Sequence, residues 1–125
     1  MNKGYQKEVY SNWGQTAAYR EYKNKTIEYT NDNWNAVHDA MNAIFICFSK
    51  LMSCNTPVSD SAVQDTVKSL QEFITANFYT CTDDILLGLG KMYVSDERFM
   101  KNIDKNGQGT AEYVKSAIEF YCLNK

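Results

Sequence analysis

Apolar residues recur at steps of three and four along most of the chain, which is the spacing of one face of an α-helix. The clearest run begins at Trp34 and ends at Met52. Its apolar positions are Trp34, Val37, Met41, Ile44, Phe45, Phe48, Leu51 and Met52. Thr30 or Asn31 can cap the start of this helix, and Asn55 suits its C-terminal cap. The pattern therefore predicts one long amphipathic helix in this part of the chain.

Four shorter helices are predicted after Pro57, because each helical run there follows a residue that can cap it. The N-terminal caps are Ser59 or Asp60, Thr82, Ser95 and Thr110. The first of these helices runs to about Asn77, and the third stops at Gly107. Two more short helices are expected near the start of the chain, over residues 5–12 and 16–28.

No segment alternates with the period of two that a half-buried β-strand requires. The sequence therefore predicts an all-α fold of six or seven helices. Their number and unequal lengths do not suit a four-helix bundle, so a globin-like arrangement of crossing helices is expected. At 125 residues the chain can bury one core, and we expect residues 1–125 to form a single domain.

Charge and hydropathy exclude several partners. The chain has 13 basic and 15 acidic side chains, a formal charge of −2, and therefore no basic face for nucleic acid. Its longest apolar run, residues 43–48, is far shorter than the roughly 20 residues that a membrane span needs. Residues 1–8 are polar and do not resemble a signal peptide. We expect a cytoplasmic domain that contacts neither nucleic acid nor membrane directly.

His38 is the single histidine, and so the one side chain that titrates near neutral pH without perturbation. It lies beside Val37 on the flank of the apolar stripe, which favours a partly buried structural imidazole. A haem or ligand sensor, or a small enzyme, built on His38 is the alternative. Acid–base catalysis needs groups of complementary pKa brought together, and one such side chain is little material for it, so we expect no catalytic residue and no cofactor.

The four cysteines, at positions 47, 54, 81 and 122, contain no CxxC pair and lie in apolar segments, which predicts free buried thiols. Cys47 and Cys54 flank the stripe of the long helix and are expected to pack. Cys81 precedes a helix start, where the helix dipole lowers a thiol pKa and nearby carboxylates raise it. We interpret Cys81 as a small buried hydrophobe rather than a nucleophile.

Two glycine-containing segments resemble known loops only in part. Residues 104–115 begin like a calcium-binding loop, but Lys115 stands where a bidentate carboxylate is required. Residues 88–91 lack the glycine spacing and the final Ser or Thr of a phosphate-binding loop. Neither segment predicts a metal or phosphate site.

Four segments carry a resemblance to a known family. They read Trp-Gly-Gln-Thr-Ala-Ala-Tyr-Arg at residues 13–20, Thr-Asn-Asp-Asn-Trp at 30–34, Leu-Gly-Lys-Met-Tyr-Val-Ser-Asp-Glu-Arg-Phe at 89–99 and Asn-Ile-Asp at 102–104. In this order and spacing, the chain from about Tyr5 to Ile118 resembles the TipA-type antibiotic-recognition domain. That family is the effector domain of MerR-type transcriptional activators and also occurs alone as a drug-sequestering protein.

The resemblance implies a globin-like all-α fold without haem. It also implies non-enzymatic binding of thiopeptides or other bulky, apolar, multi-ring antibiotics. Any contact with DNA would come from a separate N-terminal helix-turn-helix domain, and a full-length regulator could be a homodimer. A protein–protein adaptor without a small-molecule pocket is a further alternative.

One departure from the family pattern concerns position 88. Thiopeptide-binding members place a cysteine four residues before the Met-Tyr-Val block, and this chain has Gly88 there. Cys81 lies two turns earlier on the same helix face. We therefore expect the domain to bind its drug non-covalently.

The recognition cleft is expected along one face of the helix over residues 82–94, with aromatic walls from elsewhere. A glycine inside a helix costs about 1 kcal/mol relative to alanine, so Gly88 indicates close approach of a ligand or of a neighbouring helix. The predicted ligand-binding residues are Trp13, Tyr19, Trp34, Phe78, Cys81, Ile85, Gly88 and Met92.

Overall fold

The structure is a computed structural model that describes residues 17–124, and side chains from Arg20 onward except Glu21. Six helices follow one another, and no strand occurs within the described range. They are α2 (Ala17–Thr26), α3 (Asn31–Ser53), α4 (Ser61–Asn77), α5 (Asp83–Ser95), α6 (Glu97–Asp104) and α7 (Thr110–Leu123). The all-α prediction is confirmed. The helix expected over residues 5–12 lies outside the described residues.

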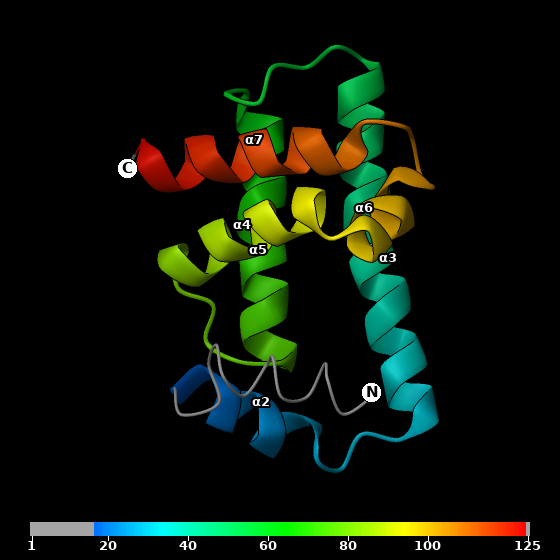
Figure 1. Cartoon of the computed structure of the whole chain (residues 1–125), viewed down its shortest axis with the longest axis vertical. Coiled ribbons are helices and arrows are strands. Elements are labelled where there is room, and N and C mark those ends of the chain that lie inside the picture. Colours follow the sequence, from blue (N-terminus) through cyan, green and yellow to red (C-terminus); the bar gives the residue numbers. More distant parts are fainter. Residues whose placement is uncertain (1–16, 125) are drawn as a thin grey trace.

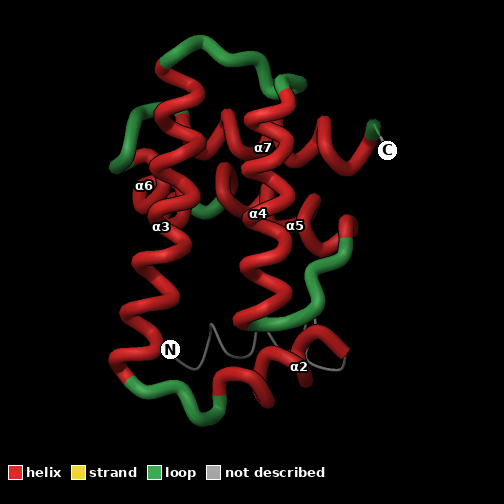
Figure 2. Tube along the Cα trace, turned by 180° about the vertical axis from the view of Figure 1, so that it is seen from behind, coloured by secondary structure: helices red, strands yellow, loops and turns green. Residues whose placement is uncertain are grey.

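The helices form two crossed antiparallel pairs (Figure 1). Helices α3 and α4 run along the long axis, and α5 and α7 lie across them. Helix α2 lies across the end of the α3–α4 pair that is remote from α7, where the view from behind also places it (Figure 2). This arrangement of unequal, crossing helices agrees with the globin-like expectation.

The core lies where the two pairs cross. Side chains from α3, α4, α5, α6 and α7 are almost completely removed from solvent there. The largest are Phe48, Leu70, Leu86, Ile103 and Ile118. Each belongs to the helical stripe that the sequence pattern predicts, so the stripe residues supply the apolar burial that holds the helices together.

The predicted caps of the long helix are present. Thr30 and Asn33 form a reciprocal capping box, with the Asn33 side chain accepting from Thr30 N at 3.0 Å and the Thr30 hydroxyl accepting from Asn33 N at 3.2 Å. At the other end Asn55 adopts φ 58°, the left-handed conformation that commonly follows a helix. Asp60 and Thr82 cap α4 and α5 as expected.

Two caps differ from the sequence prediction. Helix α6 is capped by Asp96 rather than Ser95, because the Asp96 carboxylate accepts from Arg98 N at 3.0 Å. Thr110 is the first residue of α7 rather than its cap, a position that Gly109 takes with φ 91°. The Asp104 carboxylate reaches across the loop and accepts from Ala111 N at 2.8 Å, so a distant side chain satisfies the first turn of α7.

Three side chains that were expected to pack are exposed instead. His38 and Cys47 on α3 and Cys54 just after it are all exposed, although the Cys47 sulfur lies 3.6 Å from the Thr66 hydroxyl of α4. Successive helical residues are rotated by about 100°, so a residue beside the apolar stripe is buried only where a neighbouring helix covers that flank. The prediction of a partly buried His38, and of packing roles for Cys47 and Cys54, is therefore wrong.

Replacing Gly107 by alanine should lower the free energy of unfolding by about 1–3 kcal/mol. A Cβ at this position would overlap the Ser49 hydroxyl oxygen, and Ser49 is buried and donates to Asn106 O at 2.7 Å. Gly88→Ala is the matched control, since no described atom lies within 4 Å of its Cβ position. In urea titrations the control should gain about 0.5–1 kcal/mol from helix propensity. Equal effects of the two changes would contradict this packing.

Candidate ligand-binding site

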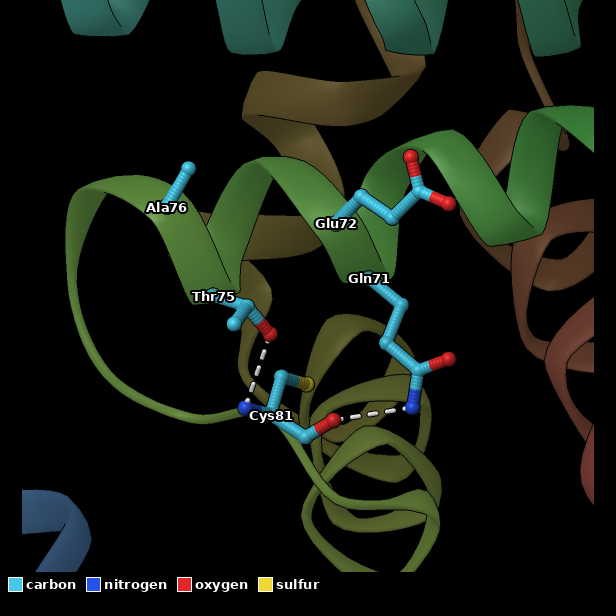
Figure 3. A pocket seen from close by; sticks show the side chains of 5 residues that line it. All are labelled: Gln71, Glu72, Thr75, Ala76 and Cys81. Atoms are coloured by element: carbon cyan, nitrogen blue, oxygen red, sulfur yellow. Dashed lines mark hydrogen bonds between the residues drawn. The ribbon is translucent and has the colours of Figure 1, made fainter.

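A hollow of about 300 Å³ opens between the C-terminal half of α4 and the connection from α4 to α5. Its lining residues are Gln71, Glu72, Thr75, Ala76 and Cys81 (Figure 3). Two hydrogen bonds hold the backbone of Cys81 against α4: Cys81 N donates to the Thr75 hydroxyl oxygen at 3.0 Å, and the Gln71 side-chain amide donates to Cys81 O at 2.8 Å. The hollow therefore has a fixed wall at Cys81.

The Cys81 thiol is 5% exposed, which confirms its interpretation as a small buried side chain. Burial, with smaller contributions from the neighbouring Cys122 and Asp83, raises the pKa of the Cys81 thiol to about 12. Since the thiolate is the nucleophile, Cys81 is a weak one near neutral pH.

An aromatic cluster lies at the same end of α4. Among the described residues the Phe78 ring has three aromatic neighbours, with ring centroids 6.1 Å from Tyr22, 6.2 Å from Phe73 and 6.2 Å from Trp34. The Trp34 and Phe78 rings are stacked at 24°, and Tyr29 meets Trp34 edge-on at 5.1 Å. We call these five residues the Phe78 cluster. It joins α2, α3 and α4 and brings together two of the predicted site residues, Trp34 and Phe78.

Two hydrogen bonds tie α2 and the loop after it to the end of α4. The Lys25 ammonium donates to Thr75 O at 2.5 Å, and the Tyr29 hydroxyl donates to Asn77 O at 2.6 Å. Carbonyl groups in a last helical turn lack intrahelical partners and carry the negative end of the helix dipole, which favours a cation. Helix α2 is thus fixed beside the hollow and the cluster.

The exposed face of α5 carries the remaining predicted residues. Ile85 and Met92 are half-buried, while Gly88 is exposed and no described atom lies within 4 Å of its Cβ position. Gly90, by contrast, is buried, and its Cβ position lies 3.4 Å from the Ile118 side chain on α7. Packing of a neighbouring helix therefore involves Gly90, whereas Gly88 stays open on the side away from α7.

Two predicted residues are not located. Trp13 lies outside the described residues, and Tyr19 belongs to α2 but its side chain is not described. The assignment of all eight residues to one ligand site stays a prediction.

The sequence reasoning missed the polar residues that fix the hollow, Gln71 and Thr75. Gln71 donates to Asp83 at 3.0 Å as well as to Cys81 O, and its side-chain oxygen accepts from the Tyr121 hydroxyl at 3.1 Å. The position of Gln71 next to Leu70, on the edge of the apolar stripe of α4, is the one feature of the sequence that could have identified it. Such a place suits a side chain that is half-buried and hydrogen-bonded.

Metal-ligating side chains do not gather in the part of the chain that is described. No three His, Cys, Asp or Glu side chains there are placed to hold a metal ion. The His38 imidazole is exposed, with its ring centroid 6.0 Å from that of Trp34. None of the described helices is long and apolar enough to cross a membrane.

The family model of the TipAS antibiotic-recognition domain matches residues 5–121. The HTH-type transcriptional activator TipA of Streptomyces coelicolor is 38% identical over 114 residues, which are 91% of this chain and 45% of that protein. The HTH-type transcriptional activator mta of Bacillus subtilis is 31% identical over 118 residues, 94% of this chain and 45% of that protein. The chain thus spans less than half the length of these relatives.

Two solved structures are similar in fold. One is TipAS of Streptomyces lividans in complex with nosiheptide, with a TM-score of 0.84 and 36% identity over 97% of this chain and 85% of that one. The other is the antibiotic-binding domain of a TipA-class multidrug resistance transcriptional regulator, with a TM-score of 0.66 and 32% identity over 70% of this chain and 94% of that one. Fold and sequence together define a helical antibiotic-recognition domain. The chain belongs to the TipAS family.

The raised pKa of Cys81 predicts a marked difference in thiol reactivity. With a pKa of about 12, a fraction of only about 10⁻⁴ of the Cys81 thiol is ionised at pH 8. Iodoacetamide should therefore label the exposed Cys47 and Cys54 at least about tenfold faster than Cys81, as followed by mass spectrometry of peptides. In urea the rates should become equal. Labelling of native Cys81 as fast as of Cys54 would contradict the burial of its thiol.

Proposed function

We propose that this domain binds bulky, apolar, multi-ring antibiotics, thiopeptides among them, and does not transform them. The observation that carries the proposal is the likeness to TipAS bound to nosiheptide, at 36% identity over 97% of this chain. A likeness of that identity and coverage supports a shared type of ligand as well as a shared fold.

The site geometry supports the same conclusion. The hollow at Cys81 and the Phe78 cluster adjoin the connection from α4 to α5, and the open face at Gly88 belongs to α5, the helix that follows this connection. Aromatic rings offer flat apolar contact, and Met92 offers a deformable one, which suits ligands of several fused or linked rings. The proposed ligand site comprises these three parts, with Trp13 and Tyr19 as further wall residues.

The chemistry of the described side chains supports binding without turnover. Cys81 is a weak nucleophile because burial raises its pKa to about 12, and the exposed His38 imidazole lies beside the Trp34 ring. No specific observation favours a haem sensor or enzyme built on His38, or a protein–protein adaptor.

The relatives are transcriptional activators more than twice as long as the matched segment. We therefore propose that the domain works either as the effector part of a MerR-type regulator or as a free-standing drug-sequestering protein, in the cytoplasm. In a regulator, DNA contact belongs to a separate helix-turn-helix domain, since the net charge here is −2, and the full-length protein would be a homodimer.

Filling the open face of α5 should weaken binding without unfolding the domain. Gly88→Phe is expected to weaken binding of a thiopeptide such as nosiheptide at least tenfold, about 1.4 kcal/mol, because the ring occupies the proposed cleft. The melting temperature should be unchanged or higher, since Gly88 is exposed and Phe has the better helix propensity. Titration followed by tryptophan fluorescence measures affinity, with Trp34 in the Phe78 cluster as reporter.

The matched control is Ser116→Phe, at an exposed position on α7. It should leave affinity unchanged. Full affinity of Gly88→Phe would show that this face of α5 is not part of the ligand site. If the wild-type domain binds none of a panel of thiopeptides and polycyclic drugs, the proposed function is wrong.

Binding should be non-covalent in this chain. After incubation with a dehydroalanine-containing thiopeptide, intact-mass measurement should show no stable adduct with the wild-type domain. Gly88→Cys should acquire an adduct, because a thiol there is exposed and the space around it is open. A wild-type adduct that disappears in Cys81→Ser would contradict this prediction and identify Cys81 as the nucleophile.

A further inference from the structure

Cys81 and Cys122 come from distant parts of the sequence but lie at the same place in the fold. Helices α5 and α7 run antiparallel, so that the last turn of α7 lies beside the first turn of α5 (Figures 1 and 2). Cys122 is in that last turn, and Cys81 is two residues before α5 begins. All four cysteines carry thiols rather than disulfides.

Both sulfur atoms contact backbone carbonyl groups at the start of α5. The Cys81 sulfur is 3.9 Å from Thr82 O, and the Cys122 sulfur is 3.6 Å from Asp83 O, so the two thiols contact carbonyl groups of consecutive residues. The charge that each thiol would carry is close enough to the other for Cys122 to raise the pKa of Cys81. The cysteines are therefore near neighbours.

The last turn of α7 is the segment that would adjust to the geometry of a disulfide. That geometry requires Cα atoms about 4.4–6.8 Å apart and a dihedral angle near ±90°. Cys81 lies in the connection between α4 and α5, outside any helix, and Cys122 lies one residue before the end of α7, beside the exposed Leu123 and Asn124. A shift of this exposed helix end toward Cys81 would meet the requirement.

Gln71 forms hydrogen bonds to both the Cys81 segment and the end of α7. Its side-chain nitrogen donates to Cys81 O at 2.8 Å, and its side-chain oxygen accepts from the hydroxyl of Tyr121, the residue before Cys122, at 3.1 Å. Figure 3 shows the Cys81 end of this bridge together with the hydrogen bond from Cys81 N to Thr75. One partner of the disulfide is thus fixed in position before any oxidation.

We propose that Cys81 and Cys122 form a reversible disulfide under oxidation by a hydroperoxide, which links the end of α7 to the connection between α4 and α5. The exposed cysteines are less suited to replace either partner within one chain, because Cys47 lies on α3 with its sulfur 3.6 Å from the Thr66 hydroxyl of α4, and Cys54 follows the end of α3. This site is independent of the proposed drug-binding function, although Cys81 also lines the hollow described above.

The reaction balances in two steps. The half-buried Cys122 thiol attacks hydrogen peroxide, the O–O bond breaks, and Cys122 becomes a sulfenic acid with release of one water. The Cys81 sulfur then attacks the Cys122 sulfur and expels hydroxide, which takes the Cys81 proton and leaves as a second water. Two thiols lose two electrons and two protons, and one peroxide is reduced to two waters. A dithiol reductant reverses the product to the two thiols.

The test uses the domain with Cys47→Ser and Cys54→Ser, which removes the exposed thiols and prevents cross-links between chains. After treatment with hydrogen peroxide and blocking of remaining thiols with N-ethylmaleimide, peptide mass spectrometry should find residues 81 and 122 linked. The intact mass should fall by two hydrogens, and dithiothreitol should restore it. Because the link closes a loop of about 40 residues, the melting temperature should rise by about 5 °C or more.

Adding Cys122→Ser is the matched control, and it should show neither the link nor the rise in melting temperature. The folded protein should form the link at least tenfold faster than the same protein in urea, since the fold brings the two thiols together. Recovery of Cys81 as a thiol with Cys122 over-oxidised, or equal rates in folded and unfolded protein, would overturn the proposal.

Discussion

The contact between α5 and α7 is the constraint on which the rest of the molecule depends. Leu86, Gly90 and Tyr93 recur at steps of four and three along α5 and are all buried, while Val114 and Ile118 are buried on α7. Side chains at this spacing occupy one face of a helix, so burying them turns the opposite face of α5 outward. That outward face carries Gly88. The orientation of the proposed ligand face thus follows from the burial of apolar side chains on its other side.

The end of α4 joins this core to the proposed site. There the chain must leave a helix whose last carbonyl groups lack intrahelical partners. Lys25 and Tyr29 supply donors from α2 and the loop after it, and Gln71 holds the backbone that leads into α5. These hydrogen bonds satisfy polar groups and at the same time fix the walls of the hollow. The same side chains therefore satisfy the polar groups at the end of α4 and fix the walls of the hollow.

The chemistry of the site is governed by environment more than by residue type. Four cysteines have the same intrinsic reactivity, but two are exposed on α3 and one is buried beside the hollow. Burial raises the pKa of Cys81, which makes it a packing residue near neutral pH and leaves shape and apolar contact as the means of recognising a ligand. The proposed antibiotic recognition without turnover fits such a site.

The sequence by itself determined the helices, most of their caps and the family. The three- and four-residue spacing predicts α3, α4, α5 and α7, since a stripe of apolar residues is a local property of one helix. The residues that flank each stripe cannot be assigned in this way, because their burial depends on which neighbouring helix covers them. Only the tertiary structure therefore decided that His38, Cys47 and Cys54 are exposed, that Gly90 rather than Gly88 contacts α7, and that Gln71 accepts a hydrogen bond from Tyr121, 50 positions away. Spacing along a helix states which side chains share a face, whereas contacts between helices decide what that face meets.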